Sequence, residues 1–212
     1  KLRFAEYSLS FSFAMPNSKK LLAGASGYSF KEWKGSFYPA KMPAEEMLHF
    51  YAGRFPAVEV NNSFYRIPAE AVLADWAEQV PEKFRFVMKA SRRITHNNRL
   101  KDQDGSLAYF LRAVNPLGPR LGPTLFQLPP TLKKDIDLLA SFLAKLPKRW
   151  VAAMEFRHSS WFDNEVYDLL RSHGVALVAV HPLRLLIELV RQQGRPGGDV
   201  ALALLFYGGI AG

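Results

Sequence analysis

Four side chains that can do chemistry crowd directly after a short apolar run. Glu155, Arg157, His158 and Trp161 follow residues 151–154 within seven positions. A carboxylate, a guanidinium, an imidazole and an indole must each be desolvated and hydrogen-bonded if they lie at the end of a buried strand. We interpret this cluster as part of a functional site. The alternative is an ion-paired strand end followed by an exposed loop.

The most basic and polar stretch of the chain, residues 91–101, follows a second apolar run at 84–88 and the boundary residue Lys89. It offers many hydrogen-bond donors and few acceptors, among them Arg92, Arg93 and His96. Donors of this kind form charge-assisted bonds with phosphate or carboxylate oxygens. We therefore predict that this stretch binds an anion; the alternative is a solvated loop.

Two further apolar runs carry isolated polar groups. Residues 57–60 contain Glu59 and are followed by Asn61 and Tyr65, and Gln127 is the polar residue inside the run 121–130. A carboxylate that points into a barrel needs a partner, so a salt bridge in the core explains Glu59 at least as well as catalysis does. We predict that Asn61, Tyr65 and Gln127 bind a ligand.

The segment 30–39 is too aromatic for an ordinary solvated loop and contains Trp33. Such a segment either covers the mouth of a pocket or packs as a lid on the top of the fold. We predict that Trp33 contacts the ligand.

Apolar runs and amphipathic segments alternate along the chain. The expected strands are residues 21–24, 57–60, 84–88, 121–130, 151–155, 174–180 and 200–206. The expected helices are residues 44–55, 69–80, 107–114, 138–146, 161–173 and 183–190. This order predicts an α/β fold with a parallel sheet and right-handed crossovers. The chain lacks the glycine-rich turns of dinucleotide and P-loop folds. We therefore expect a TIM-like (β/α) barrel, in which ligands bind at the carboxyl ends of the strands; since such a barrel needs eight units, the last is expected to be missing or altered.

Length and composition limit the class of protein. A chain of 212 residues with 49% hydrophobic residues suits one domain. We expect residues 1–20 to be an N-terminal extension or leader, with Met15 as the natural start. Residues 21–212 are expected to form the barrel, with residues 183–212 atypical.

Charge and residue types narrow the partners. Without cysteine, thiolate catalysis and cysteine-ligated metals are excluded. The net charge of +9 fits an anionic ligand, nucleic acid or simple solubility. Lys and Arg form no continuous run, which favours phosphate-sized anions over duplex DNA. No stretch has the length of a membrane span, so we expect no membrane partner and a cytoplasmic location. No close pair of metal-ligating residues occurs, so we predict no metal site; cofactors and oligomeric state stay open.

Five stretches in order resemble the domain of unknown function 72 family, also called YecE-like. They are residues 24–39, 58–68, 84–89 together with 94–96, 121–130 and 155–161. The resemblance covers about residues 21–182 and implies a TIM-like barrel, but no particular reaction. Its motif positions fall on Trp33, Asn61, Tyr65, Lys89, His96, Gln127, Glu155, Arg157, His158 and Trp161. Beyond residue 182 the chain departs from the family pattern.

These residues support two hypotheses of function. In the first, the chain is an enzyme for a phosphorylated sugar or nucleotide-like substrate. Lys89, Arg92 or Arg93 holds the anion, Arg157 clamps it, Trp33 and Trp161 stack on a ring, Glu155 is the general base, and His96 or His158 shuttles the proton. In the second, the chain is a non-catalytic module that binds single-stranded nucleic acid or another polyanion. A third alternative is a barrel that self-associates through apolar edges.

Overall fold

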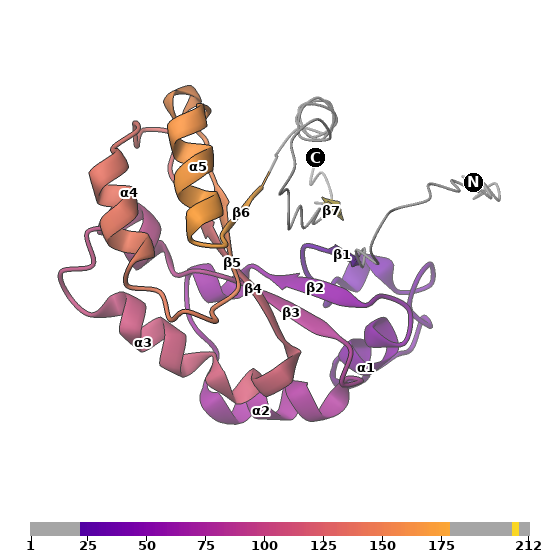
Figure 1. The fold of residues 1–212 in the computed structure, drawn as a ribbon. Helices are drawn as coiled ribbons and strands as arrows, with labels where there is room; N and C mark the ends of the chain where they lie inside the picture. The colour runs from indigo at the N-terminus through magenta and orange to yellow at the C-terminus, as the bar shows by residue number, and fades with distance from the viewer. Residues whose placement is uncertain (1–21, 179–204, 208–212) are drawn as a thin grey trace, which may run out of the picture.

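The apolar runs of the sequence form one parallel sheet. The computed structural model describes residues 22–178 and 205–207. The strands are β1 (Ala23–Ala25), β2 (Ala57–Val60), β3 (Arg85–Lys89), β4 (Leu121–Gln127), β5 (Ala152–Glu155), β6 (Ala176–Leu177) and β7 (Leu205–Tyr207). They pair in the order β6-β5-β4-β3-β2-β1-β7, and each pair is parallel (Figure 1). The expected α/β class and the parallel sheet are confirmed.

The helices follow one another around one side of this curled sheet (Figure 1). They are α1 (Met47–Ala52), α2 (Glu70–Gln79), α3 (Ser106–Ala113), α4 (Ile136–Leu143) and α5 (Asn164–Ser172). Shorter helical turns are η1 (Lys31–Trp33), η2 (Ala44–Glu46), η3 (Asn62–Phe64), η4 (Arg93–Asn97), η5 (Asn115–Arg120) and η6 (Ser159–Trp161). The helix expected at residues 161–173 begins at Asn164, because the Asp163 carboxylate caps it by accepting from the Val166 amide at 3.1 Å.

The core lies between the helices and the outward-facing side chains of the strands. Phe126 on β4 packs edge-on against Phe142 of α4, with ring centroids 5.1 Å apart. Phe86 on β3 stacks against Trp76 of α2 at 6.0 Å. Because side chains alternate along a strand, the positions between these core residues point to the opposite, concave face of the sheet. In β2 the core residues Val58 and Val60 flank Glu59, a residue of that face.

Several expectations reach beyond what the described residues show. Among them no pairing joins β6 to β7, so a closed barrel stays a prediction. The expected extension at 1–20, the helix at 183–190 and most of the atypical segment 183–212 lie outside the described residues, so the division into domains also stays a prediction. In the described part of the chain, no helix has the length and hydropathy that crossing a membrane requires.

Candidate functional site

Polar side chains stand at or near the carboxyl ends of four neighbouring strands. Glu59 lies in β2, Lys89 ends β3, Gln127 ends β4 and Glu155 ends β5. The register places Gln127 directly beside Glu155 on the neighbouring strand. Because the strands are parallel, their carboxyl ends share one edge of the sheet. The fold thus gathers residues that are far apart in the sequence.

A hollow of about 470 Å³ opens at this edge, and we call it the anion hollow. It is lined by Asn61, Phe64, Tyr65, Lys89, Arg92, His96 and Gln127. Six of these residues were predicted from the sequence, and the structure brings them together. Its volume lies in the range of ordinary small-molecule sites.

Two short turns hold the lining residues in place. The Ser63 hydroxyl in η3 lies 2.7 Å from the carbonyl oxygens of both Val60 and Lys89, which ties this turn to the end of β3. After β3 the chain makes the wide π-type turn η4, a geometry that is frequent at functional sites. This turn places Arg92 and His96 on the wall of the anion hollow.

The anion hollow is electropositive. The Lys89 ammonium lies 5.0 Å from the centre of the Phe64 ring. The Phe64 and His96 rings pack edge to face, with their centroids 4.9 Å apart. Within residues 22–178, neither Lys89 nor Arg92 forms a salt bridge. Burial first, and then the charges of Lys89 and Arg92, lower the pKa of His96. The imidazole is therefore neutral at pH 7 and able to accept a proton.

Two buried carboxylates lie behind the lining residues and differ in their partners. Glu155 is 5% exposed; its oxygens accept from the Gln127 amide at 2.9 and 3.0 Å, and Arg157 Nε forms an ion pair with it at 2.5 Å. Burial raises the pKa of Glu59, and the Glu155 charge adds to this, while Lys89 and a hydrogen bond from Asn61 oppose it. Glu155 is thus held by a hydrogen-bond donor and an ion-pair partner, and Glu59 is the carboxylate that protonates more readily than usual.

Comparisons with known proteins identify the family of the chain. The family model described as "Protein of unknown function DUF72" matches residues 22–201. The chain belongs to the DUF72 family. The resemblance seen in the sequence motifs is confirmed, and the match runs to residue 201, beyond residue 182 where the chain was expected to depart from the family pattern.

Curated relatives in this family are the UPF0759 proteins YecE of Escherichia coli K12 and YunF of Bacillus subtilis 168. YecE is 35% identical over 116 residues, which are 54% of this chain and 43% of YecE. YunF is 30% identical over 141 residues, which are 63% of this chain and 50% of YunF. The chain therefore spans about half the length of these relatives, and their names state no activity.

Solved DUF72 structures show the same fold. A DUF72 protein from Thermotoga maritima MSB8 is 31% identical with a TM-score of 0.66, covering 76% of this chain and 64% of that one. A DUF72 protein from Enterococcus faecalis V583 is 24% identical with a TM-score of 0.60, covering 75% and 60%, and supports the fold alone. DUF72 membership therefore fixes the fold class here and leaves the chemistry to be argued from the site.

In this DUF72 chain, two residues of the cluster after β5 have structural partners. His158 caps η6, because its Nδ1 accepts from the Ser160 amide at 3.1 Å. Trp161 is completely buried, stacks on Phe156 at 4.7 Å and donates to the Leu132 carbonyl at 2.7 Å. Neither residue lines the anion hollow, so the predicted proton shuttle at His158 and ring stacking at Trp161 receive no support from their positions.

Three other predicted residues also lie outside the lining of the anion hollow. Trp33 packs between Phe30 and Tyr38, at 4.7 and 6.1 Å between ring centroids. Arg93 pairs with Asp104 at 2.6 Å. Arg157 reaches the site only through Glu155, so its position supports a positioning role more than the predicted clamp.

Phe64 lines the hollow and Glu59 lies beneath it, although neither was predicted as a site residue. The signal for Glu59 was present, since a carboxylate in the middle of an apolar run demands a special environment. The described residues contain no group of three or more His, Asp or Glu that could hold a metal ion.

Proposed function

We propose that the anion hollow binds a small phosphorylated ligand, a sugar phosphate or a nucleotide-like molecule, and that the chain transforms it by general acid–base chemistry. The observation that supports this proposal is the pairing state of two cations. Lys89 and Arg92 both line the hollow, and neither is neutralised by a carboxylate salt bridge among the described residues. Two such cations beside a small cavity suit an anion of phosphate size.

Proton transfer is the role of His96 in this proposal. Of the groups predicted to move protons, His96 lines the hollow, whereas Glu155 lies behind Gln127. Its Nδ1 lies 2.9 Å from the Thr95 hydroxyl, which leaves Nε2 for the ligand. A neutral imidazole can remove a proton beside a carbonyl or from an attacking water.

The carboxylates then act on the lining residues. Glu155 orients the Gln127 amide, and Glu59 faces Lys89 and Asn61 from below. Glu155 as the general base remains the alternative assignment, and it requires Gln127 to move aside.

The proposal includes a TIM-like barrel, because ligands in that fold bind at the carboxyl ends of the strands. The curl of the parallel sheet and the likeness to the Thermotoga maritima protein support it.

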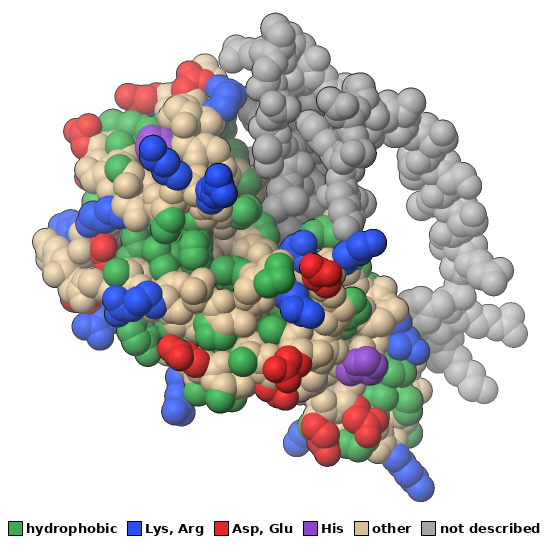
Figure 2. Space-filling model, turned by 60° about the horizontal axis from the view of Figure 1, so that its bottom comes forward, with side chains coloured by type: hydrophobic (Ala, Val, Ile, Leu, Met, Phe, Trp, Pro, Cys, Tyr) green, Lys and Arg blue, Asp and Glu red, His purple; other side chains and the backbone are tan. Residues whose placement is uncertain are grey.

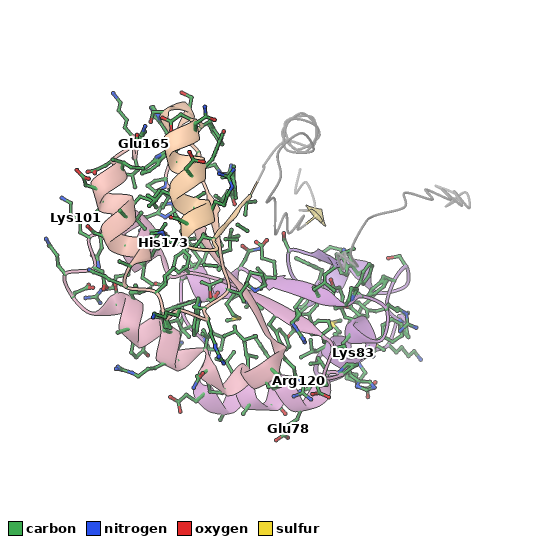
Figure 3. All side chains as sticks on the ribbon, in the orientation of Figure 1. Glu78, Lys83, Lys101, Arg120, Glu165 and His173 are labelled. Carbon is green, nitrogen blue, oxygen red and sulfur yellow. The ribbon has the colours of Figure 1, made fainter. Side chains whose placement is uncertain are left out.

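Binding of phosphate esters tests the anion site. In calorimetric titrations with sugar phosphates and nucleotides, Lys89→Ala and Arg92→Ala should each weaken binding by about 10- to 100-fold, since a charge-assisted bond contributes roughly 1.5–3 kcal/mol. Lys83→Ala, which removes an exposed lysine on the outer surface (Figure 3), is the matched control and should bind like the parent. Equal affinities for all four proteins would exclude this site.

Turnover tests the role of His96. With a substrate found in the binding screen, His96→Gln should retain affinity within a few-fold and lose most of kcat, because general acid–base catalysis contributes about 100- to 10,000-fold. If Glu155→Gln abolishes kcat while His96→Gln does not, the base is Glu155 and the assignment is reversed.

One observation favours the alternative, a module that binds single-stranded nucleic acid. Tyr65 is 74% exposed and lies beside Arg92 in the hollow, and the next residue is Arg66. Exposed aromatic and basic groups together bind bases and phosphates. Against it, Figure 2 shows basic and acidic side chains interspersed on the face it presents, without a continuous basic stripe. Six of the charged or titratable residues are also spread around the outside of the fold: Glu78, Lys83, Lys101, Arg120, Glu165 and His173 (Figure 3).

Salt dependence separates the two functions. Affinity for an oligonucleotide held by several phosphates falls steeply as salt rises, whereas a ligand with one phosphate group shows a shallow slope. A steep slope combined with no binding of phosphate monoesters would select the polyanion module.

A further inference from the structure

A second hollow, of about 1130 Å³, adjoins the anion hollow, and we call it the side hollow. Its walls include Tyr65, Arg66, Val72, Arg93, Asp104 and Tyr109. They come from the segment after η3, from α2, from η4 and from the start of α3.

The two hollows are neighbours separated by little more than a backbone. Asn61 lines the anion hollow and Asn62 the side hollow. In the same way Arg92 lines the first and Arg93 the second, while Tyr65 lines both. The two hollows meet at the side chain of Tyr65, so a ligand that lies across this exposed ring contacts both.

The side hollow gathers exposed apolar surface. Three of the five large hydrophobic residues that are exposed in the described chain line it: Tyr65 at 74%, Val72 at 41% and Tyr109 at 59%. Scattered exposed hydrophobic residues are ordinary, but their concentration in a concave surface marks a contact site. Tyrosine rings offer flat faces for stacking together with a polar edge.

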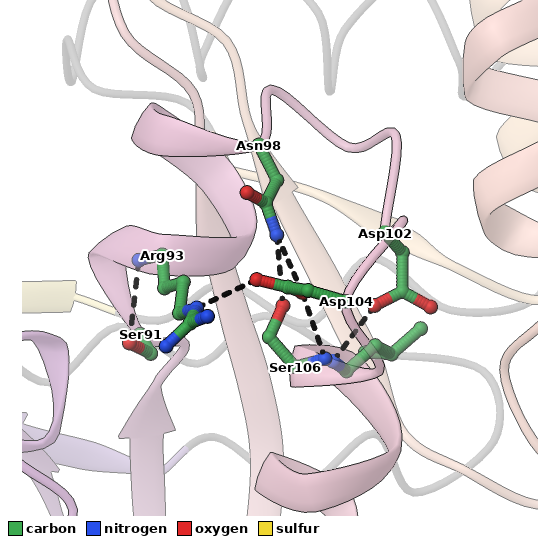
Figure 4. A network of polar contacts seen from close by, with 7 residues as sticks. Ser91, Arg93, Asn98, Asp102, Asp104 and Ser106 are labelled. Atoms are coloured by element: carbon green, nitrogen blue, oxygen red, sulfur yellow. Dashed lines mark hydrogen bonds and ion pairs between the residues drawn. The ribbon is translucent and has the colours of Figure 1, made fainter.

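Two charged side chains of the side hollow, Arg93 and Asp104, are paired with each other. The Asp104 carboxylate accepts from Asn98 at 2.7 Å and from Arg93 at 2.6 Å, and the Ser106 amide donates to it at 3.1 Å (Figure 4). These hydrogen bonds, led by that from Asn98, hold the pKa of Asp104 well below its usual range. Arg93 and Asp104 therefore neutralise each other on this wall, whereas Arg66, which also lines the side hollow, forms no salt bridge among residues 22–178. The exposed rings of Tyr65 and Tyr109 are the surface that the side hollow offers to a flat group.

We infer that the side hollow binds the uncharged flat ring of a ligand whose phosphate lies in the anion hollow. This makes the ligand a nucleoside monophosphate or a phosphate ester of the same design, in place of a bare sugar phosphate. The inference rests on the proposed function and narrows its substrate class.

A pair of ligands that differ only by the ring tests the inference. Adenosine 5′-monophosphate and ribose 5-phosphate are titrated calorimetrically into the full chain. The nucleotide should bind about 10-fold or more tightly than the sugar phosphate, because stacking a base on an aromatic side chain has an effect of this size. Tyr109→Ala should remove most of this difference and leave ribose 5-phosphate binding unchanged.

Matched variants assign each part of the ligand. Lys89→Ala should weaken both ligands equally, since both carry the phosphate. Val151→Ala is the control for Tyr109→Ala, because Val151 is 55% exposed and lines neither hollow; it should change neither affinity.

The outcomes distinguish the inference from the function on which it rests. If the two ligands bind equally, and Lys89→Ala weakens both while Tyr109→Ala weakens neither, the side hollow does not bind the ring. Phosphate binding in the anion hollow is then still supported. Binding of neither ligand overturns both. Loss of the difference in Tyr109→Ala, with the sugar phosphate unaffected, supports both.

Discussion

The side-chain amide of Gln127 donates to both carboxylate oxygens of Glu155, over 2.9 and 3.0 Å. The two residues are direct neighbours in the register of β4 and β5, and Glu155 is 5% exposed. Arg157, which follows the end of β5, forms an ion pair with the same carboxylate at 2.5 Å. A buried carboxylate that loses its hydrogen-bond donor cannot replace it with bulk water, so we expect the Gln127 amide to stabilise the fold.

Gln127→Leu should therefore destabilise the chain. We expect a loss of about 1–3 kcal/mol in the free energy of unfolding, measured by urea denaturation, because the substitution leaves part of a buried carboxylate without its partner. Gln79→Leu is the control: Gln79 also donates to a carboxylate, that of Asp75 at 2.6 Å, but on the exposed surface of α2. Its cost should stay within about 0.5 kcal/mol. Equal costs for both variants would show that Glu155 does not depend on Gln127.

The positions of the strands could be predicted because strands buried on both faces are continuous apolar runs. The run at 57–60 gave the bounds of β2, and that at 151–155 gave β5 to within one residue. Asn61, Lys89 and Gln127 could be predicted as site residues for the same reason. They follow or end such runs, and parallel strands bring their carboxyl ends to one edge.

For the other predicted site residues, tertiary contacts determine whether the side chain faces the hollow or the protein. His158 and Trp161 satisfy the sequence pattern of a site equally well whether they face a ligand or the protein. Only the turn η6 and the nearby Leu132 carbonyl direct the imidazole to a cap and the indole to the core. Arg93 and Arg92 are identical in type and adjacent, yet Asp104 pairs with Arg93. No periodicity in the sequence encodes such a choice.

His158 should contribute to stability through its cap. His158→Ala should cost roughly 0.5–2 kcal/mol in thermal or urea unfolding, and His158→Asn should restore most of it, because asparagine is a favoured capping residue. Ligand affinity per folded molecule should be unchanged in both variants. The comparison with His96→Ala, which lines the anion hollow, separates the two histidines. If His158→Asn folds normally and still loses binding or turnover, the predicted shuttle role of His158 is restored.

Trp161 should behave as a core residue. Trp161→Ala removes a fully buried ring that stacks on Phe156 and should cost about 3–5 kcal/mol. Trp161→Phe keeps most of the packing but leaves the Leu132 carbonyl without its donor, so a loss of about 1–3 kcal/mol is expected. Denaturation curves give both values. The opposite result, normal stability in Trp161→Phe with a large loss of ligand affinity, would place the indole in the binding site.

Glu59 should make stability depend on pH. Burial raises its pKa, so the folded chain favours the protonated form more than the unfolded chain does. The stability that it contributes is fully present below the ordinary glutamate pKa of about 4.3 and is lost as pH rises through the raised value of the folded chain. Glu59→Gln keeps the shape and removes the titration. Its Tm should equal that of the parent near pH 4 and exceed it by a few degrees at pH 8, since each kcal/mol corresponds to roughly 2–4 °C for a chain of this size.

The test of this prediction is whether the Tm of Glu59→Gln at pH 8 lies above or below that of the parent. Lys89 and the Asn61 amide oppose the effect of burial by favouring the charged carboxylate. If the interactions with Lys89 and Asn61 outweigh burial, Glu59→Gln is less stable than the parent at pH 8, and the Glu59 carboxylate acts as the counter-ion of Lys89. Glu82→Gln, at an exposed position, is the control for removing a carboxylate and should leave Tm nearly unchanged at both pH values. Ligand affinity measured at the same two pH values shows whether binding requires the protonated or the charged form of Glu59. A protonated Glu59 leaves the Lys89 charge free for the phosphate, so affinity should rise as Glu59 is neutralised and should be higher in Glu59→Gln than in the parent at pH 8.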